Sequence, residues 1–425
     1  MRPARPSTLF CAFLTLLNDR LGESLVFPLL PFLLEGFTRD GRILGLLTGS
    51  YAVAQFLATP LIGALSDRYG RRPVIACCVA GSVLALGLFS ATIAFPWARQ
   101  WPAAQAAGLP LALLFAARLI DGLSGGTAAT AGAVLADVTP PERRARAFGL
   151  IGVAFGLGFI LGPALGGVLG QLNVHLPLLV AVLIAALNLV LVLLLLPETH
   201  PVEARIALPR KRELQPFTQL LRLFRNPLIR RLGAAFFLFF LAFNGFTAVL
   251  VLYFKEAFGW GPALAGTAFL IVGVVATVVQ GGLIGPLVKR FGEWRLSLAG
   301  LGFVMAGCSL VPLARPATAQ PLVFTAVALL ALGTGLVTPC LRSLVSRRLD
   351  DSGQGAALGS LQGLQSLGSF IGPPLAGQAY EGLGRTSPFW LAIALLVGVV
   401  FLVAGGRGLR PPGPASVSAI HGEGG

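Results

Sequence analysis

Five charged residues of this sequence fall inside long apolar stretches, where charge is rare. They are Asp19, Arg20, Glu23, Arg118 and Asp121. At the centre of a bilayer each such side chain costs at least about 2.5–3.5 kcal/mol, so it must face a partner or a polar cavity. A carboxylate in that setting can take up and release a proton, and a neighbouring arginine favours its ionised form. The five residues therefore predict proton transfer within a membrane.

The spacing of these residues leaves their pairing open. Asp19 and Glu23 are four residues apart and share one face of a helix, whereas Arg20 points partly elsewhere. Arg118 and Asp121 lie one turn apart on another helix. One interpretation is static ion pairs, between a carboxylate near residue 20 and either arginine, and between Arg118 and Asp121. The other is a proton site on Asp19 or Glu23 whose charge state depends on Arg118. Either acid can carry the proton.

Twelve apolar stretches are long enough to hold these side chains in a bilayer as helices. The sequence predicts an all-α membrane protein with a six-helix bundle in 1–197, a basic cytoplasmic linker at 198–229, a second six-helix bundle in 230–406 and a disordered tail at 407–425. The predicted spans are 8–34, 43–65, 74–95, 110–136, 146–170, 174–197, 230–254, 262–287, 296–314, 320–341, 354–380 and 387–406.

Composition excludes several other classes of protein. The chain is 55% hydrophobic and 12% charged, which is too little charge for a soluble surface. The net charge of +15 arises in short loops between spans, so it argues for membrane topology and against nucleic acid. Basic loops stay in the cytoplasm, which places both termini there. The basic residues predicted on the other side are Arg39, Arg42, Arg99, Lys255, Arg315 and Arg385.

Patterns for metal binding or catalysis are missing from the sequence. The five cysteines lie in apolar segments without metal-ligand spacing, and the three histidines are scattered. Neither a phosphate-binding loop nor a nucleophile–base set is present. The first apolar segment contains charges and is too long for a signal peptide. We therefore expect no enzyme, no metal and no cofactor, with a proton gradient as the energy source.

Two pairs of similar segments divide the chain into halves. Residues 63–72 resemble 285–295, with glycines seven residues apart among basic residues, and 158–167 resemble 368–377. A membrane protein made of two similar halves is typical of secondary transporters, whose substrate site lies between the halves.

Twelve spans in a 6+6 arrangement, with Gly-x-x-x-Asp-Arg-x-Gly-Arg-Arg at 63–72, resemble the major facilitator superfamily over residues 8–406. The run Gly158-x-x-x-Gly162-Pro163-x-x-Gly166-Gly167 is similar to the superfamily's antiporter motif. The match narrows to the drug/proton antiporter group that contains the tetracycline efflux proteins. Three further segments carry that narrower resemblance: 19–31, 136–146 and 346–355.

The resemblance implies rocker-switch alternating access by a monomer in a bacterial-type inner membrane. It also implies that a lipophilic or amphipathic small molecule leaves in exchange for H+. The tetracycline exporters carry acidic residues within spans three and nine, at positions where this sequence has Ala85 and Val304. That departure argues against tetracycline itself as the substrate.

Charges at the predicted cytoplasmic end form a candidate gate. Asp67 ends span two, Arg71 lies one turn on, and Asp137 ends span four on the same side. An acid, a base and an acid at one face can form a charged latch that closes in the outward-facing state. Gly63 and Gly70 permit close approach and a tight turn. The alternative is loop charges that are merely solvated.

The glycine-rich motif of span five predicts a hinge, or a tight seal against span eight or eleven, because glycine lets helices approach to backbone contact. A proline inside a helix removes one hydrogen bond and permits a bend. The alternative is plain small-residue packing without motion. The candidate residues are Gly158, Gly162, Pro163, Gly166 and Gly167, with Gly372 and Pro373 as counterparts in span eleven.

The second half is expected to carry no charge within its spans, with Arg342 just past span ten. Its polar candidates for substrate contact are Asn244, Gln280, Gln362 and Gln365, although each also suits a hydrogen bond between helices. Phenylalanines crowd span seven, so part of that set suits a flat apolar ligand and the rest suits packing.

These features predict a proton-coupled exporter whose partners are a small-molecule substrate, H+ and membrane lipid. A symporter or exporter of a specific polar metabolite is the main rival, and it would need polar contacts in both halves. A lipid facilitator also fits an apolar cavity. A non-transporting receptor fits less well, because a static protein has no use for a latch and a hinge.

Overall fold

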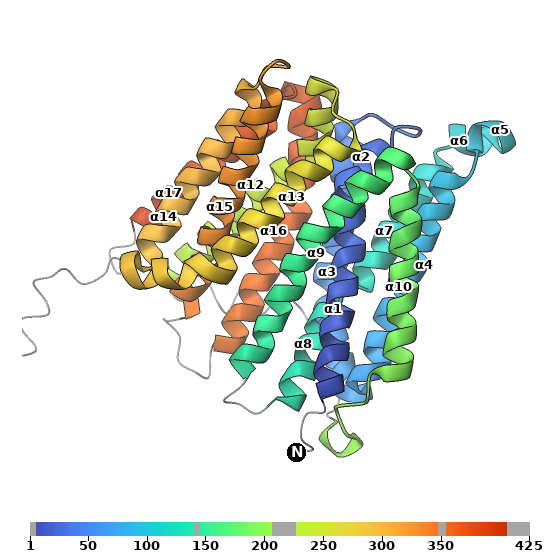
Figure 1. Cartoon of the computed structure of the whole chain (residues 1–425), viewed down its shortest axis with the longest axis vertical. Coiled ribbons are helices and arrows are strands. Elements are labelled where there is room, and N and C mark those ends of the chain that lie inside the picture. The colour runs from blue at the N-terminus through green and yellow to red at the C-terminus, as the bar shows by residue number, and fades with distance from the viewer. Residues whose placement is uncertain (1–5, 140–143, 206–226, 347–353, 406–425) are drawn as a thin grey trace, which may run out of the picture.

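A computed structural model describes residues 6–139, 144–205, 227–346 and 354–405, and the regular elements in these ranges are all helices (Figure 1). They form the predicted two bundles of six transmembrane helices, which lie side by side. The end at which the first helix begins, at Pro6, is called here the basic end, and the end that carries residues 34–41 and 258–262 is called the opposite end (Figure 1).

In the first bundle, successive spans run in opposite directions between the two ends. Its first span is α1 (Pro6–Val26) followed by the short turns η1 (Phe27–Leu29) and α2 (Leu30–Leu33). The remaining elements are α3 (Gly41–Tyr69), α4 (Arg71–Ala94), the short α5 (Trp97–Gln100) and α6 (Pro102–Ala106), α7 (Leu109–Leu123), α8 (Thr127–Val138), α9 (Arg144–Leu172) and α10 (Leu176–Leu195).

The second bundle repeats that course. A turn η3 (Val202–Ala204) precedes it. The span that begins at α13 continues through η4 into the first residues of α14, and the next span follows within α14 after a kink at Gly292, which has a φ of 77°. The elements are α12 (Pro227–Phe258), α13 (Pro262–Val278), the π-helical turn η4 (Val279–Leu283), α14 (Ile284–Leu313), α15 (Ala319–Ser346), α16 (Gln354–Leu383) and α17 (Ser387–Ala404).

Length and apolar composition alone identify only some of the membrane-spanning helices. Eight helices among the described residues are long and apolar enough to cross a membrane. The first span is not among them, because Asp19, Arg20 and Glu23 interrupt its apolar run. The predicted linker lies partly outside the described residues, since 206–226 are not described, and the predicted tail lies wholly outside them.

Two span predictions need correction. Span four is broken at Ser124–Gly126 into α7 and α8, because the run of small residues there is a poor helix former. Gln55 of α3 donates to the carbonyl of Gly125 at 3.2 Å and satisfies part of the break. The second prediction, of no charge within spans seven to twelve, is wrong at Arg342, because α15 continues to Ser346. It is also wrong near the ends of α12, which contains Arg230, Arg231, Lys255 and Glu256.

Glycines on α3 bring the two bundles into backbone contact at the opposite end. A Cβ on Gly49 would lie 2.8 Å from the carbonyl oxygen of Phe370, and one on Gly45 would overlap the carbonyl of Pro373 on α16. Gly377 faces the backbone of Gly41 in the same way. We call this contact between α3 and α16 the helix seam. It tolerates no larger residue without movement of a backbone.

A second contact of the same kind joins α9 to α13. A Cβ on Gly167 would lie 3.1 Å from both the Cα of Gly266 and the carbonyl oxygen of Pro262. A Cβ on Gly266 would lie 2.6 Å from the carbonyl oxygen of Pro163. Both contacts between the bundles therefore rest on small residues near the opposite end.

Polar links across the bundles close the same end. Lys255 of α12 forms an ion pair with Glu35 at 2.8 Å and donates to the carbonyl of Pro31 at 3.3 Å. Glu381 of α16 accepts a hydrogen bond from the backbone nitrogen of Gly41 at 2.7 Å. At the basic end, by contrast, no described atom lies within 4 Å of a Cβ built on Gly63. The described glycine contacts and polar links between the bundles thus lie at the opposite end.

The link between Glu35 and Lys255 is expected to weaken in acid. Hydrogen bonding to Lys255 lowers the pKa of Glu35, so the link is present above the ordinary pKa of a glutamate. It is lost as the pH falls through the lowered pKa. Spin labels at Arg42 and Leu383, both exposed and on different bundles, should report longer distances at a pH below the lowered pKa of Glu35 than at pH 7.

Glu35→Gln should lengthen the same distance at pH 7. The double exchange of Glu35→Lys with Lys255→Glu should restore the short distance, since it rebuilds the pair in reverse. An unchanged distance distribution in Glu35→Gln would show that the glycine contacts alone hold this end closed.

Candidate functional site

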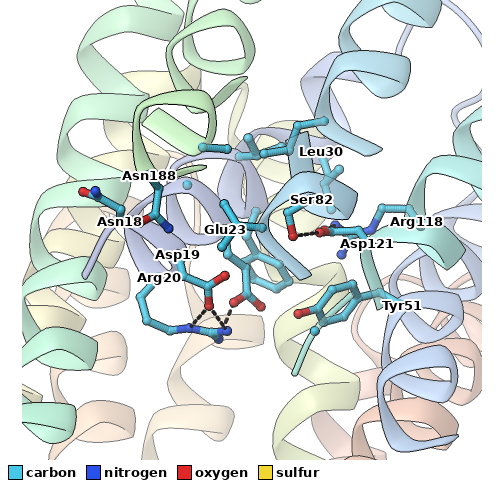
Figure 2. Close-up of a pocket in the computed structure, with 17 residues that line it drawn as sticks. Asn18, Asp19, Arg20, Glu23, Leu30, Tyr51, Ser82, Arg118, Asp121 and Asn188 are labelled. Carbon is cyan, nitrogen blue, oxygen red and sulfur yellow. Dashed lines mark hydrogen bonds and ion pairs between the residues drawn. The ribbon is translucent and has the colours of Figure 1, made fainter. Parts of the chain in front are cut away.

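The first bundle encloses a cavity of about 40 Å³ that gathers the charged residues of its spans (Figure 2). Asp19, Arg20 and Glu23 of α1 lie on one side, and Ser82, Asp121, Arg118 and Tyr51 lie on the other. The sequence prediction that these charges face a cavity or one another agrees with this arrangement. Asn18 and Asn188 also line the cavity.

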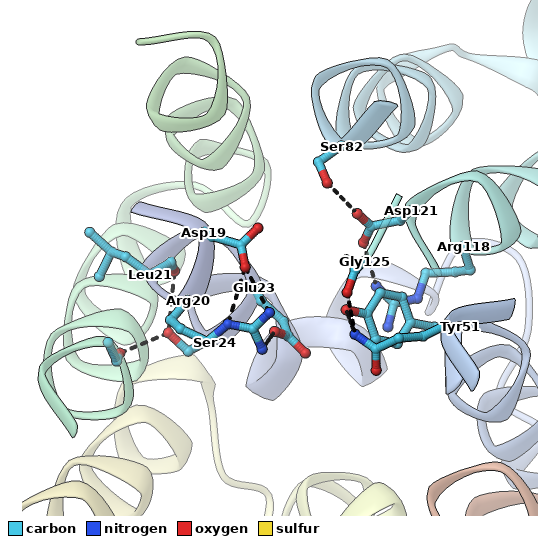
Figure 3. A network of polar contacts seen from close by, with 12 residues as sticks. Asp19, Arg20, Leu21, Glu23, Ser24, Tyr51, Ser82, Arg118, Asp121 and Gly125 are labelled. Atoms are coloured by element: carbon cyan, nitrogen blue, oxygen red, sulfur yellow. Dashed lines mark hydrogen bonds and ion pairs between the residues drawn. The ribbon is translucent and has the colours of Figure 1, made fainter. Parts of the chain in front are cut away.

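Arg20 is held between both carboxylates of its own helix (Figure 3). Its guanidinium donates to Asp19 at 2.7 and 3.2 Å and forms a second ion pair with Glu23. The side chain of Asp19 is 13% exposed and that of Glu23 is 35% exposed. Asp19 is therefore the enclosed acid of the pair, and Glu23 reaches toward open space.

The second charged pair lies on α7. Arg118 and Asp121 are 3.5 Å apart, and Asp121 accepts a hydrogen bond from Ser82 of α4 at 3.0 Å. The guanidinium of Arg118 lies over the ring of Tyr51, 4.7 Å from its centre. In this conformation Arg118 thus pairs with Asp121, and the acids of α1 pair with Arg20.

The charges in this cavity do not balance. Three acids and two arginines line it, so the fully ionised cluster carries one excess negative charge. An unbalanced charge in a low-dielectric interior is unfavourable, and binding a single proton removes it. Neutralising the fully ionised cluster would therefore take one proton.

A larger cavity of about 210 Å³ lies between the bundles and shares Arg20, Glu23 and Phe27 with the smaller one. Its wall in the second bundle comes from α12, α13 and α15. Apolar side chains dominate that wall: Phe243, Leu250, Ala268, Phe269, Val272, Val327, Leu330 and Ala331. The charge cluster and the apolar chamber thus share two charged residues of α1, Arg20 and Glu23.

The predicted substrate contacts fall in different places. Asn244 lines the larger cavity, whereas Gln280 is exposed in the π-helical turn. Gln365 accepts a hydrogen bond from Arg342 at 2.8 Å, so it matches the helix–helix alternative. The side chain of Gln362 lies outside the described residues. Of the phenylalanines in span seven, Phe243 lines the cavity while Phe236 is buried in packing.

At the basic end the structure brings the predicted latch residues together within the first bundle. Arg71 pairs with Asp67 and, at 3.1 Å, with Asp137, and it donates to Ser66 at 2.6 Å. Gly70 makes the turn with a φ of 104°, a value that favours glycine. Arg71, Asp67 and Asp137 therefore form ion pairs with one another, which differs from the alternative of separate, solvated charges.

One residue of this group was missed in the sequence. Glu198 accepts hydrogen bonds from the backbone nitrogens of Arg71 at 2.9 Å and Arg72 at 3.2 Å. It thus caps the start of α4, where a helix dipole favours negative charge. The available signal was its position at the end of span six, which returns to the same end of the bundle.

The glycines of span five divide between two neighbours. Gly158, Gly162 and Gly166 face α1 of the same bundle, so the prediction of a seal against span eight or eleven is wrong for these three. A repeat of four residues places them on one helix face, and Gly167 falls on another face, where it contacts α13 as the seal requires.

The corresponding residues of span eleven, Gly372 and Pro373, also face different neighbours, one within its own bundle and one in the other bundle. Gly372 faces Leu241 and Gly245 of its own bundle, whereas Pro373 faces Gly45 in the helix seam.

Comparison with known proteins agrees with this architecture. The family model described as Major Facilitator Superfamily matches residues 8–373. A tetracycline resistance protein of class C from Escherichia coli is 34% identical over 90% of this chain and 91% of its own length. Major facilitator superfamily domain-containing protein 10 from Homo sapiens is 28% identical over 93% of this chain and 92% of its own length.

Solved structures give the same result. The human organic anion transporter MFSD10 aligns with a TM-score of 0.69 at 27% identity, covering 94% of this chain and 100% of that chain. A D-xylose-proton symporter aligns with a TM-score of 0.74 at 16% identity, covering 95% of this chain and 98% of that one, and this likeness shows the fold alone.

Proposed function

The chain belongs to the major facilitator superfamily, and from that premise we propose that it exports a lipophilic or amphipathic small molecule in exchange for protons. As a member of that superfamily it is a multi-pass membrane transporter and not an enzyme. One observation carries the proposal: a charge cluster that lacks one proton for neutrality shares Arg20 and Glu23 with an apolar cavity between the bundles. Proton and substrate can therefore influence each other directly.

In the proposed cycle the basic end faces the cytoplasm, as do both termini, and the described conformation is inward-facing. The protein acts as a monomer in a bacterial-type inner membrane and needs no cofactor beyond the proton gradient. Substrate enters the larger cavity from the cytoplasmic side or the inner leaflet. The helix seam and the Glu35–Lys255 link hold the outer end closed at this stage.

Closing of the basic end completes the switch. Asp67, Arg71 and Asp137 are already ordered in the first bundle, so they offer a fixed charged surface to the second bundle. When that end closes, the outer contacts part and substrate leaves. A proton then enters from outside, neutralises the cluster and favours the return to the inward-facing state.

Import of a polar metabolite is the rival function, and the lining of the larger cavity argues against it. Its wall in the second bundle offers Asn244, Thr247 and Thr334 as polar side chains among eight apolar ones. A sugar or nucleoside needs hydrogen bonds from both sides of its site, because an unpaired polar group costs about 1–3 kcal/mol when buried.

Dye transport by purified protein in proteoliposomes tests the proposed function. With an imposed pH gradient, the wild type should move a lipophilic dye opposite to the flow of protons, and an ionophore that collapses the gradient should stop it. Absence of movement across a broad dye panel would favour a narrow metabolite transporter. Movement that ignores the gradient would leave a transporter without proton coupling.

A further inference from the structure

The polar groups of the larger cavity are oriented in a way that limits which ligands they can bind. Thr247 and Thr334 donate their hydroxyl hydrogens to the carbonyls of Phe243 and Leu330 on their own helices. A hydroxyl that donates in this way has only acceptor lone pairs left for another partner. The amide of Asn244 likewise directs one N–H to the carbonyl of Phe240 at 2.9 Å.

The wall from the first bundle has the same character. Ser24 donates to the carbonyl of Gly158 at 2.7 Å, and the guanidinium of Arg20 is engaged by Asp19 and Glu23. Arg20 is the cation on the described lining of this cavity, and Glu23 is its acid. Since Arg20 is already shared with Asp19, its charge does not fully balance the carboxylate of Glu23.

Building on the proposed function, we propose that the larger cavity selects amphiphiles with a positively charged, hydrogen-bond-donating head. Glu23 is the residue that determines this specificity. The acceptor oxygens of Thr247 and Thr334 supply secondary contacts, and the rings of Phe243 and Phe269 face the apolar body of the ligand. Aromatic faces also attract cations, which adds to the same preference.

This assignment divides the roles of the two acids on α1. Asp19 lines the small cavity and is more enclosed, which suits a group that exchanges a proton. Glu23 lines both cavities, so a cationic head that approaches it competes with Arg20. Release of Arg20 toward Asp19 then strengthens the remaining pair and opposes protonation of Asp19 while substrate is bound.

An anionic amphiphile meets the opposite environment. It would need hydrogen-bond donors, and the described hydroxyls direct theirs into helix carbonyls, although Asn244 keeps a second N–H. It would also approach the excess negative charge of the cluster. The cavity therefore discriminates by charge as well as by apolar surface.

Equilibrium binding of three matched probes tests the assignment without transport. We would titrate 1-naphthylmethylammonium, 1-naphthylmethanol and 1-naphthylmethanesulfonate into purified protein in nanodiscs of neutral phosphatidylcholine. The ammonium probe should bind at least about tenfold more tightly than the alcohol, and the sulfonate should bind most weakly. Glu23→Gln should reduce the difference between ammonium and alcohol to less than about twofold.

Three controls separate specificity from folding. Glu203→Gln removes an exposed carboxylate remote from both cavities and should leave the preference intact. Unchanged affinity for the alcohol probe in Glu23→Gln shows that the cavity still forms. If that variant does not fold, Thr334→Val replaces it, and it should weaken ammonium binding about threefold and alcohol binding by less, because a hydrogen bond from a charged donor is the stronger one.

Two results would overturn the inference: tightest binding of the sulfonate, or an ammonium preference that survives Glu23→Gln. Failure of all three probes to bind would also overturn it. These outcomes are distinct from failure of the proposed function, because proton-driven transport of neutral or anionic dyes in proteoliposomes would still support export.

Discussion

Asp19→Asn is expected to abolish uphill export while leaving downhill movement of substrate in place. Asparagine keeps the shape of the side chain but can neither bind nor release the proton that neutralises the cluster. With one proton exchanged per substrate, a gradient of one pH unit supports at most about tenfold accumulation, since one unit corresponds to about 1.4 kcal/mol. In the variant that accumulation should fall to none.

The measurement is the steady-state dye ratio across proteoliposomes at a fixed pH difference, together with exchange of dye in the absence of a gradient. The variant should retain exchange, which shows that it folds and still changes conformation. Glu203→Gln is the matched control and should behave as wild type. If Asp19→Asn still accumulated dye as the wild type does, the proton would have to bind to Glu23 or Asp121 instead.

Gly45→Ala is expected to force the helix seam apart. The added Cβ would lie 2.8 Å from the carbonyl carbon of Pro373, and closer still to its oxygen. Both atoms belong to backbone, so relief requires a shift of α3 or α16. Overpacking of this kind costs about 1–3 kcal/mol, which moves the balance between open and closed outer ends by roughly 5- to 150-fold.

Spin labels at Arg42 and Leu383 should report this change as a longer distance, and the rate of transport should fall because the inward-facing state is less populated. Gly302→Ala on α14 is the matched control, since no described atom lies within 4 Å of a Cβ built there. A short distance retained in Gly45→Ala would show that the seam has room which the static contacts do not reveal.

Local patterns in the sequence were sufficient to predict the twelve spans, the two bundles and the candidate residues of the charge cluster. Arg20 pairs with Asp19 and Glu23, and Asp67 pairs with Arg71, so these partners lie within four residues of one another in the sequence. The spacing made these pairs possible but did not choose between them and the alternatives. The excess of one acid could also be counted from the sequence. The position of the cluster beside an apolar chamber could not, because it depends on how two bundles pack.

Contacts between distant segments account for what the sequence did not predict. Glu198 reaches Arg71 across 127 residues, and Arg342 reaches Gln365 across 23. The stripe at Gly158, Gly162 and Gly166 looks the same whether it faces α1 or the second bundle. In each case the residue type indicates a close or polar contact, and only the packing identifies the partner.

The excess of one carboxylate in the cluster has a consequence for the response of the protein to voltage. If one proton enters for each monovalent cation that leaves, the cluster bears the same charge on both journeys across the membrane. The complete exchange then moves no net charge. Such a transporter draws on the chemical difference in protons and is indifferent to the electrical potential, so it works equally well in a membrane that is electrically depolarised.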